Sequence, residues 1–214
     1  MTLAVLSDLN QITETLIQIP AGERRWLGNL KGALPSLVLS ELVKQSEHLI
    51  VMVAKDSAQV SLIDEELRFF GVTPHVFPDW ETLPYDRLSV HQSIISERLS
   101  LLSNVPKNGI ILVAATTLAQ RIAPPKWLLG QHFDIKKGQK LNFEAQRQRL
   151  SRAGYRAVET VFEPGEYALR GSLMDIFPMG QEQPIRIELF YDEVESLRYF
   201  DAETQRTTTH TDNF

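Results

Sequence analysis

At residues 185–201 the chain has the sequence IRIELFYDEVESLRYFD, which sets the pattern of its carboxyl-terminal part. Side-chain character alternates over the first six residues, as in a β-strand with one face in a core. One face is expected to carry Ile185, Ile187 and Leu189, and the other Arg186, Glu188 and Phe190. The preceding stretch GEYALRGSLMDIFPMG, at residues 165–180, adds strand-like segments and turn residues. Together the two stretches predict a small α+β domain with antiparallel hairpins.

Phe190 stands out on the second strand face, because its neighbours there, Arg186 and Glu188, are charged. Aromatic side chains and arginine are enriched at protein interfaces. We therefore predict a recognition surface rather than a catalytic pocket. The structural alternative is that another segment covers Phe190 and that Arg186 forms an ion pair with Glu188 on the same strand.

The amino-terminal part has a different pattern, in which short apolar runs alternate with helical periodicity. The runs at residues 48–54 and 109–114 predict buried parallel strands, and Asp56 predicts the start of a helix between them. Further helices are predicted at residues 9–19, 35–43 and 94–102, with a short strand at residues 75–77. This order of elements is typical of an α/β layer fold with a parallel sheet.

A domain boundary is predicted at Ala123-Pro124-Pro125, where two prolines interrupt helical continuation. It divides the chain into an α/β domain over residues 1–125 and the small α+β domain over residues 126–214. The second domain is expected to contain a helix from about residue 143 to 153 before its strands.

Composition narrows the possible classes of function. The 214 residues are 43% hydrophobic, which supports a conventional buried core, and carry a formal net charge of -5. This acidic balance lacks the basic footprint of a nucleic-acid-binding protein, so strong independent DNA binding is not expected. The start of the chain has no signal-peptide pattern and no run is long enough to cross a bilayer, which favours a cytoplasmic location.

No metal site is predicted. The chain has no cysteine, which excludes disulfides and thiolate ligands. Its histidines lack the paired spacing of a ligand set. They are His48, His75, His91, His132 and His210.

Several motifs in the carboxyl-terminal part resemble a block shared by bacterial nucleotide-excision-repair proteins, namely UvrB and the transcription-repair coupling factor (Mfd) family. The motifs are Arg170-Gly171, Asp175-Ile176-Phe177-Pro178, Arg186, Glu188-Leu189-Phe190, Glu193-Val194-Glu195 and Phe200-Asp201. Residues 79–86, DWETLPYD, followed by HQ at 91–92 and SERL at 96–99, resemble the coupling factors specifically. The likeness runs from about Pro20 to about Arg206.

This resemblance implies the amino-terminal UvrB-like module of the coupling factor, a fragment of a much longer chain. In that family the module is a non-catalytic adaptor that binds UvrA, the damage-recognition ATPase of excision repair. Carried over by position, the UvrA-binding residues are Arg170, Arg186 and Phe190. The resemblance also implies other domains of the full-length factor as partners. RNA polymerase and DNA would be contacted through parts outside these residues, as would the ATP-dependent translocase motor.

The segment GNLKGALPS at residues 28–36 stands where the resemblance places the phosphate-binding loop of UvrB. A working loop needs glycines, a lysine for the β and γ phosphates, and a Ser or Thr for magnesium. Here Pro35 stands about where the lysine should be, Leu34 adds bulk, and Lys31 is displaced. We predict a non-functional loop and no ATP cofactor. The residues of this degenerate loop are Gly28, Gly32, Leu34, Pro35 and Ser36.

Other interpretations remain open. The chain could be an ATP-dependent, UvrB-like helicase subunit that binds damaged DNA, or a regulatory domain that masks the same surface within its own polypeptide. The acidic run at residues 64–66 resembles the end of a magnesium-binding strand, but its helical context predicts a solvated helix face. Trp80 and Tyr85 could form a second contact surface, although a structural loop is the favoured interpretation.

Overall fold

The computed structural model describes residues 2–82, 89–122, 124 and 134–214, with side chains from Leu9 onward. Its contacts divide the chain into two compact units. Unit 1 comprises Met1–Asp79 and Val105–Arg121, and unit 2 comprises Trp80–Asn104 and Ile122–Phe214. The boundary predicted at residue 125 stays a prediction, because Ala123 and Pro125 lie outside the described residues.

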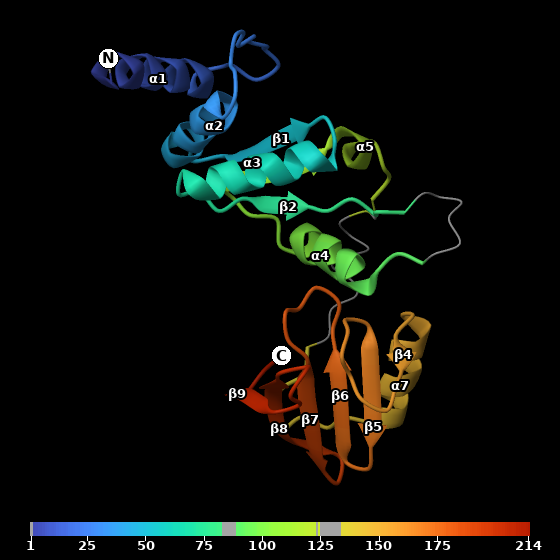
Figure 1. The fold of residues 1–214 in the computed structure, drawn as a ribbon. Helices are drawn as coiled ribbons and strands as arrows, with labels where there is room; N and C mark the ends of the chain where they lie inside the picture. Colours follow the sequence, from blue (N-terminus) through green and yellow to red (C-terminus); the bar gives the residue numbers. More distant parts are fainter. Residues whose placement is uncertain (1, 83–88, 123, 125–133) are drawn as a thin grey trace. The chain divides into compact units, whose positions relative to one another are not determined.

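Unit 1 is built on a parallel sheet with the strand order β1-β3-β2 (Figure 1). The strands are β1 (Leu49–Ala54), β2 (His75–Phe77) and β3 (Gly109–Ala114). Ile110 and Leu112 of β3 are almost completely buried, as predicted. The prediction of a fully buried strand is wrong for β1, because Val51 and Val53 on one of its faces are exposed. The predicted parallel arrangement is confirmed.

The helices of unit 1 are α1 (Thr2–Ile17), α2 (Leu34–Gln45), α3 (Ser57–Phe69) and the short α5 (Ala115–Leu118). Helices α2 and α3 pack against the sheet, and α1 packs against α2. The Asp56 side chain accepts a hydrogen bond of 2.9 Å from the backbone N–H of Gln59, so it caps α3 as predicted. Val60, Ile63 and Leu67 of α3 pack into the core formed with β1 and β3.

Unit 2 contains a six-stranded sheet with the order β4-β5-β6-β7-β8-β9 (Figure 1). The first pair is parallel and the others are antiparallel, which confirms the predicted hairpins. The strands are β4 (Arg156–Ala157), β5 (Glu166–Arg170), β6 (Leu173–Phe177), β7 (Ile185–Phe190), β8 (Glu193–Phe200) and β9 (Thr207–Thr211). The helices of this unit are α4 (Gln92–Ser103) and α7 (Phe143–Arg152).

The two faces of the unit 2 sheet differ in character. One face carries Met174, Ile187 and Leu197, which pack with Leu150 of α7 in a fully buried core. We call the opposite face, which is covered only in part, the polar face. It carries Arg170, Asp175, Arg186, Glu188, Phe190 and Arg198 on strands β5 to β8. The predicted alternation along β7 is therefore confirmed.

Tyr155 follows α7 and packs against the core of unit 2. Its hydroxyl oxygen accepts a hydrogen bond of 3.0 Å from the backbone N–H of Met179. The next residue, Gly180, donates its N–H to the hydroxyl of Ser96 in α4 at 2.9 Å. Burial raises the pKa of Tyr155, although the Met179 N–H opposes the shift.

This raised pKa predicts that unit 2 loses stability at alkaline pH. The protonated phenol is favoured in the folded state, so its contribution is fully present below the unfolded pKa of about 10 and is lost as pH rises through the folded pKa. Tyr155→Phe should therefore show a flatter loss of unfolding free energy than the unaltered chain between about pH 9 and 11. Urea denaturation across this range is the measurement. Parallel plots of unfolding free energy against pH for the two proteins would show that Tyr155 does not contribute to the loss of stability at alkaline pH.

Candidate functional site

The centre of the polar face is a carboxylate held by two arginines from neighbouring strands. Asp175 of β6 is only 3% exposed and receives the Nε of Arg186 at 2.7 Å and its Nη2 at 2.8 Å. Arg170 of β5 donates from Nη2 to the same carboxylate at 3.1 Å. Two arginines predicted to bind the partner are thus brought together by a residue that the sequence analysis did not assign to the site.

The two arginines differ in how far they reach solvent. The side chain of Arg186 is 19% exposed and that of Arg170 is 53% exposed. Arg186 also lies over the ring of the buried Phe200, with its guanidinium carbon 4.7 Å from the ring centroid. The hydrogen bond to Asp175 raises the pKa of Arg186, while burial opposes this. Arg186 is therefore a structural element of the face as well as a candidate contact.

Both guanidinium groups keep donors available for a partner. Within the described part of the chain, the Nη1 of Arg186 and the Nε and Nη1 of Arg170 have no hydrogen-bond partner. Arginine presents its donors in a planar fork suited to carboxylates and carbonyl groups. The face can therefore recognise acidic or carbonyl groups while Asp175 holds the forks in place.

Glu188 does not pair with Arg186 along the strand, contrary to the structural alternative suggested by the sequence. It accepts hydrogen bonds from Arg198 and Ser196 of β8 instead. The reason is register, since Arg198 lies directly opposite Arg186 and next to Glu188 on the neighbouring strand. Ion pairs on this face therefore run across strands, which is the usual unit of sheet stabilisation.

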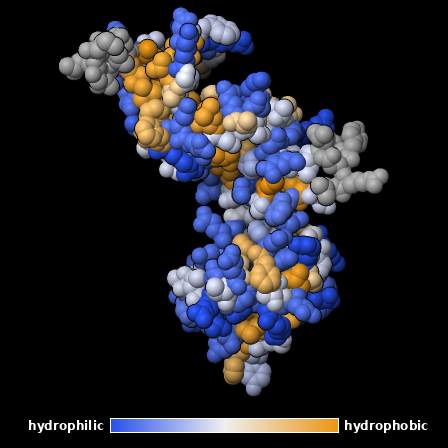
Figure 2. Space-filling view, viewed as in Figure 1, coloured by the Kyte–Doolittle hydropathy of each residue, from blue (hydrophilic) through white to orange (hydrophobic). Residues whose placement is uncertain are grey.

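Phe190 is 64% exposed, so no described segment covers it. Its ring packs edge to face against that of Tyr191, with 4.8 Å between centroids. In the view of Figure 2, most of the surface of unit 2 is hydrophilic. An exposed aromatic pair at the end of such a face has the character of an interface anchor.

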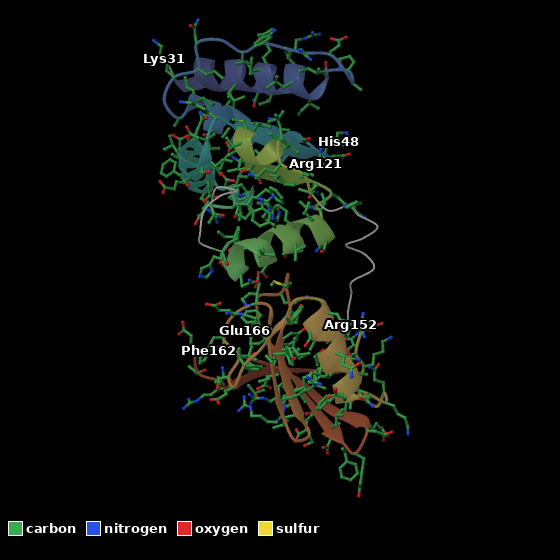
Figure 3. The ribbon with its side chains drawn as sticks, turned by 90° about the vertical axis from the view of Figure 1, so that its right-hand side faces the viewer. Lys31, His48, Arg121, Arg152, Phe162 and Glu166 are labelled. Carbon is green, nitrogen blue, oxygen red and sulfur yellow. The ribbon has the colours of Figure 1, made fainter. Side chains whose placement is uncertain are left out.

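The other end of the polar face is closed by a loop that Glu166 fixes. Its carboxylate accepts the backbone N–H groups of Phe162 and Glu163 at 2.9 and 3.0 Å, and an Arg156 guanidinium N–H at 2.9 Å. Figure 3 labels Glu166 and Phe162, which lie close together in unit 2. The loop places Val161 in a small cluster with Phe200. The accessible part of the face therefore lies toward Arg170 and Phe190.

The degenerate phosphate loop lies in unit 1, before and at the start of α2. Helix α2 begins at Leu34 with Pro35 in its first turn, and the Leu34 N–H donates to the Lys31 carbonyl at 3.3 Å. Ser36 is fully buried and its hydroxyl donates to the Glu66 carboxylate at 2.5 Å. Figure 3 shows Lys31 on the loop that precedes α2. An anion at this helix start would meet few available N–H groups and a neighbouring carboxylate.

This arrangement predicts that nucleotide does not stabilise the chain. Addition of about 5 mM magnesium-ATP should leave the melting temperature unchanged within about 1 °C, whereas a ligand at 100 times its Kd adds about 2.7 kcal/mol. Differential scanning calorimetry of the whole chain measures this. A rise of several degrees would show that the loop around Gly28 and Gly32 still holds phosphates.

The acidic run at residues 64–66 lies in α3, as predicted. Asp64 pairs with Arg68 one turn later on the same helix. Glu66, however, is not simply solvated, because it accepts the hydrogen bond from buried Ser36. The sequence pattern could not show this contact between helices.

The segment at residues 79–86 is described only in part. Trp80 lies beneath the Arg98 guanidinium, whose carbon is 3.9 Å from the ring centroid. Tyr85 and Asp86 lie outside the described residues. Trp80 therefore has a packing partner within unit 2. A role of this segment in binding a partner stays a hypothesis.

Among the described residues, no group of three or more His, Asp or Glu side chains is placed to hold a metal ion. The described helices are also too short or too polar to span a bilayer.

Comparison with known proteins places this geometry in a family context. Residues 133–214 match the family model described as the UvrB interaction domain. The transcription-repair-coupling factor of Escherichia coli strain K12 is 44% identical over 194 residues, or 89% of this chain and 17% of that protein. The Haemophilus influenzae factor is 46% identical over 86% of this chain and 16% of its own length. The Myxococcus xanthus factor is 29% identical over 89% of this chain and 17% of its own length.

The family match covers residues 133–214, so this part of unit 2 resembles the UvrB interaction domain. More particularly, the chain resembles the amino-terminal UvrB-like module of transcription-repair-coupling factors. It spans only 16–17% of the length of these three relatives, so their full activities do not transfer to it directly.

Proposed function

We propose that this chain is a non-catalytic adaptor that binds UvrA through the polar face of unit 2. Arg170, Arg186 and Phe190 are the proposed contact residues. In transcription-coupled excision repair, this contact would recruit repair proteins to lesions where RNA polymerase has stalled. Polymerase and DNA would be engaged by parts of a longer protein outside these 214 residues.

One observation supports the proposal most strongly. Within a domain that matches the UvrB interaction family, an exposed phenylalanine lies on the same sheet face as two arginines anchored on one buried carboxylate. Such an arrangement combines apolar area with oriented donors, the combination that dominates binding energy at protein interfaces. The partner surface should carry acidic or carbonyl groups around an apolar contact.

Calorimetric titration of the whole chain with purified UvrA tests the proposal. Saturable binding with a dissociation constant in the micromolar range or below is expected, equivalent to about 8 kcal/mol or more. No detectable heat or complex with both proteins at about 50 micromolar would contradict direct binding by this chain.

A further inference from the structure

The tip of the β7–β8 hairpin carries a residue that its backbone conformation disfavours. Phe190 pairs with Glu193, so Tyr191 and Asp192 alone form the loop. Tyr191 has a φ of 56°, in the left-handed region where a β-carbon is strained. Two-residue hairpin loops favour Gly, Asn or Asp at such positions. The β5–β6 hairpin follows this rule, with Gly171 at a φ of 60° in the corresponding place.

Neighbouring residues hold the tip in this conformation. The backbone N–H of Leu141 donates to the Asp192 carbonyl at 2.8 Å. The Lys140 ammonium group lies 2.9 Å from the Asp192 carboxylate, and Lys140 also forms a β-bridge with Glu193. These contacts anchor the two residues that follow Tyr191 in the hairpin.

The side chain of Tyr191 carries a second cost, because it is 88% exposed. The ring that it packs against belongs to Phe190, which is itself exposed. A strained backbone residue with a large exposed aromatic side chain adds little to the core of unit 2. Both features are expected of a side chain that contacts a binding partner and does not stabilise its own domain.

Tyr191 also borders a shallow pocket at the same end of the sheet. The walls of this pocket include Gly171, Ser172 and Leu189. Leu189 belongs to the core face of β7, so this pocket lies on the core side of the hairpin tips and is separate from the polar face.

We propose that Tyr191 is a contact residue for UvrA and forms one aromatic anchor with Phe190. This inference rests on the proposed function and extends it to a residue outside the set of Arg170, Arg186 and Phe190. The anchor receives an apolar segment of UvrA, while the arginines bind its polar surroundings. Because the Tyr191 backbone is strained and its ring is exposed, removal of the ring is expected to reduce binding without reducing stability.

Tyr191→Asn tests this inference in the whole chain, because asparagine tolerates the left-handed conformation but lacks the ring. We expect UvrA affinity to fall about fivefold or more, as for an interface anchor. The melting temperature should stay unchanged or rise by about 2 °C, since the backbone strain is relieved. Titration calorimetry and thermal melts measure the two effects. Unchanged affinity would overturn the inference.

Tyr191→Phe is the matched control, because it keeps the ring and its conformation but removes the hydroxyl. It should bind as the unaltered chain does, and an equal loss in both variants would contradict an anchor formed by the ring. Failure of the inference is distinguishable from failure of the proposed function. If the unaltered chain and the Tyr191 variants bind equally while Phe190→Ala does not, only the inference fails. If the unaltered chain does not bind UvrA, the proposed function itself fails.

Discussion

Replacement of Phe190 by alanine is expected to weaken UvrA binding by about 2 kcal/mol, roughly thirtyfold in the dissociation constant. Phe190 is 64% exposed at the end of β7 and lies outside the core cluster of unit 2. Its removal therefore eliminates apolar contact area for a partner without leaving a cavity in the protein. Titration calorimetry gives the affinity, and circular dichroism with a thermal melt confirms that the variant is folded.

Phe69→Ala is a matched control for this experiment. Phe69 is 85% exposed at the end of α3 and also packs edge to face against its sequence neighbour, Phe70. It resembles Phe190 in exposure and aromatic pairing but lies in unit 1. The control should bind UvrA with unchanged affinity. Equal losses in the Phe69 and Phe190 variants would indicate nonspecific apolar association instead of a defined site.

Arg186→Ala is expected to reduce the unfolding free energy of unit 2 by about 3 kcal/mol, because it leaves a buried carboxylate without its main partner. Asp175 is 3% exposed, and among the described residues its carboxylate would keep one hydrogen bond, from Arg170. The guanidinium that covers Phe200 would be lost as well. Urea denaturation monitored on unit 2 measures the change.

Arg170→Ala is the corresponding control, since Arg170 is 53% exposed and contributes only one of the three hydrogen bonds to Asp175. Its removal should lower the unfolding free energy by about 1 kcal/mol or less. Equal stability in the Arg186 variant and the unaltered chain would contradict the structural role assigned to the pair. The different exposure of the two arginines accounts for the difference between the two expected losses.

The structural role of Arg186 affects how variants of the polar face can be used to map the interface. A loss of UvrA binding in an Arg186 variant combines the loss of a contact with damage to the face that carries it. Arg170 and Phe190 are cleaner probes, because their side chains are exposed and their removal leaves the Arg186–Asp175 pair in place.

Local sequence signals were sufficient to predict much of the fold. The apolar runs that became β1 and β3 have the length and composition of buried parallel strands, and Asp56 caps α3 as its residue type predicts. Alternation along β7 correctly separated its core face from its polar face. These features depend on residues close together in the sequence, so no tertiary information was needed.

The pairing on the polar face could not be predicted in the same way. Asp175 and Arg186 meet because β6 and β7 adopt one particular register, and Glu188 meets Arg198 because of the register between β7 and β8. Strand register is a property of the assembled sheet, so the sequence suggested the wrong partner for Arg186. The contact of Ser36 with Glu66 is likewise a product of helix packing.

Tyr191 was missed for a different reason. The sequence contains the signal, since residues 191–192 separate two alternating segments as a two-residue hairpin loop would. Loop length alone does not give the sign of φ, however. Only the backbone conformation shows that a tyrosine occupies a position suited to glycine or asparagine.

The interpretation as an ATP-dependent helicase subunit gains no support from the geometry of unit 1. Pro35 lacks an N–H group, and the Ser36 hydroxyl is committed to Glu66. Both features work against phosphate and magnesium binding at this helix start.

Hydrogen–deuterium exchange of the chain with and without UvrA tests the central claim most directly, namely that the polar face and its hairpin tips bind UvrA. We predict slower exchange at residues 170–173 and 189–193 in the complex, with unchanged exchange in α3 of unit 1. Unchanged exchange at both hairpin tips in a saturated complex, together with slowing confined to unit 1, would contradict it.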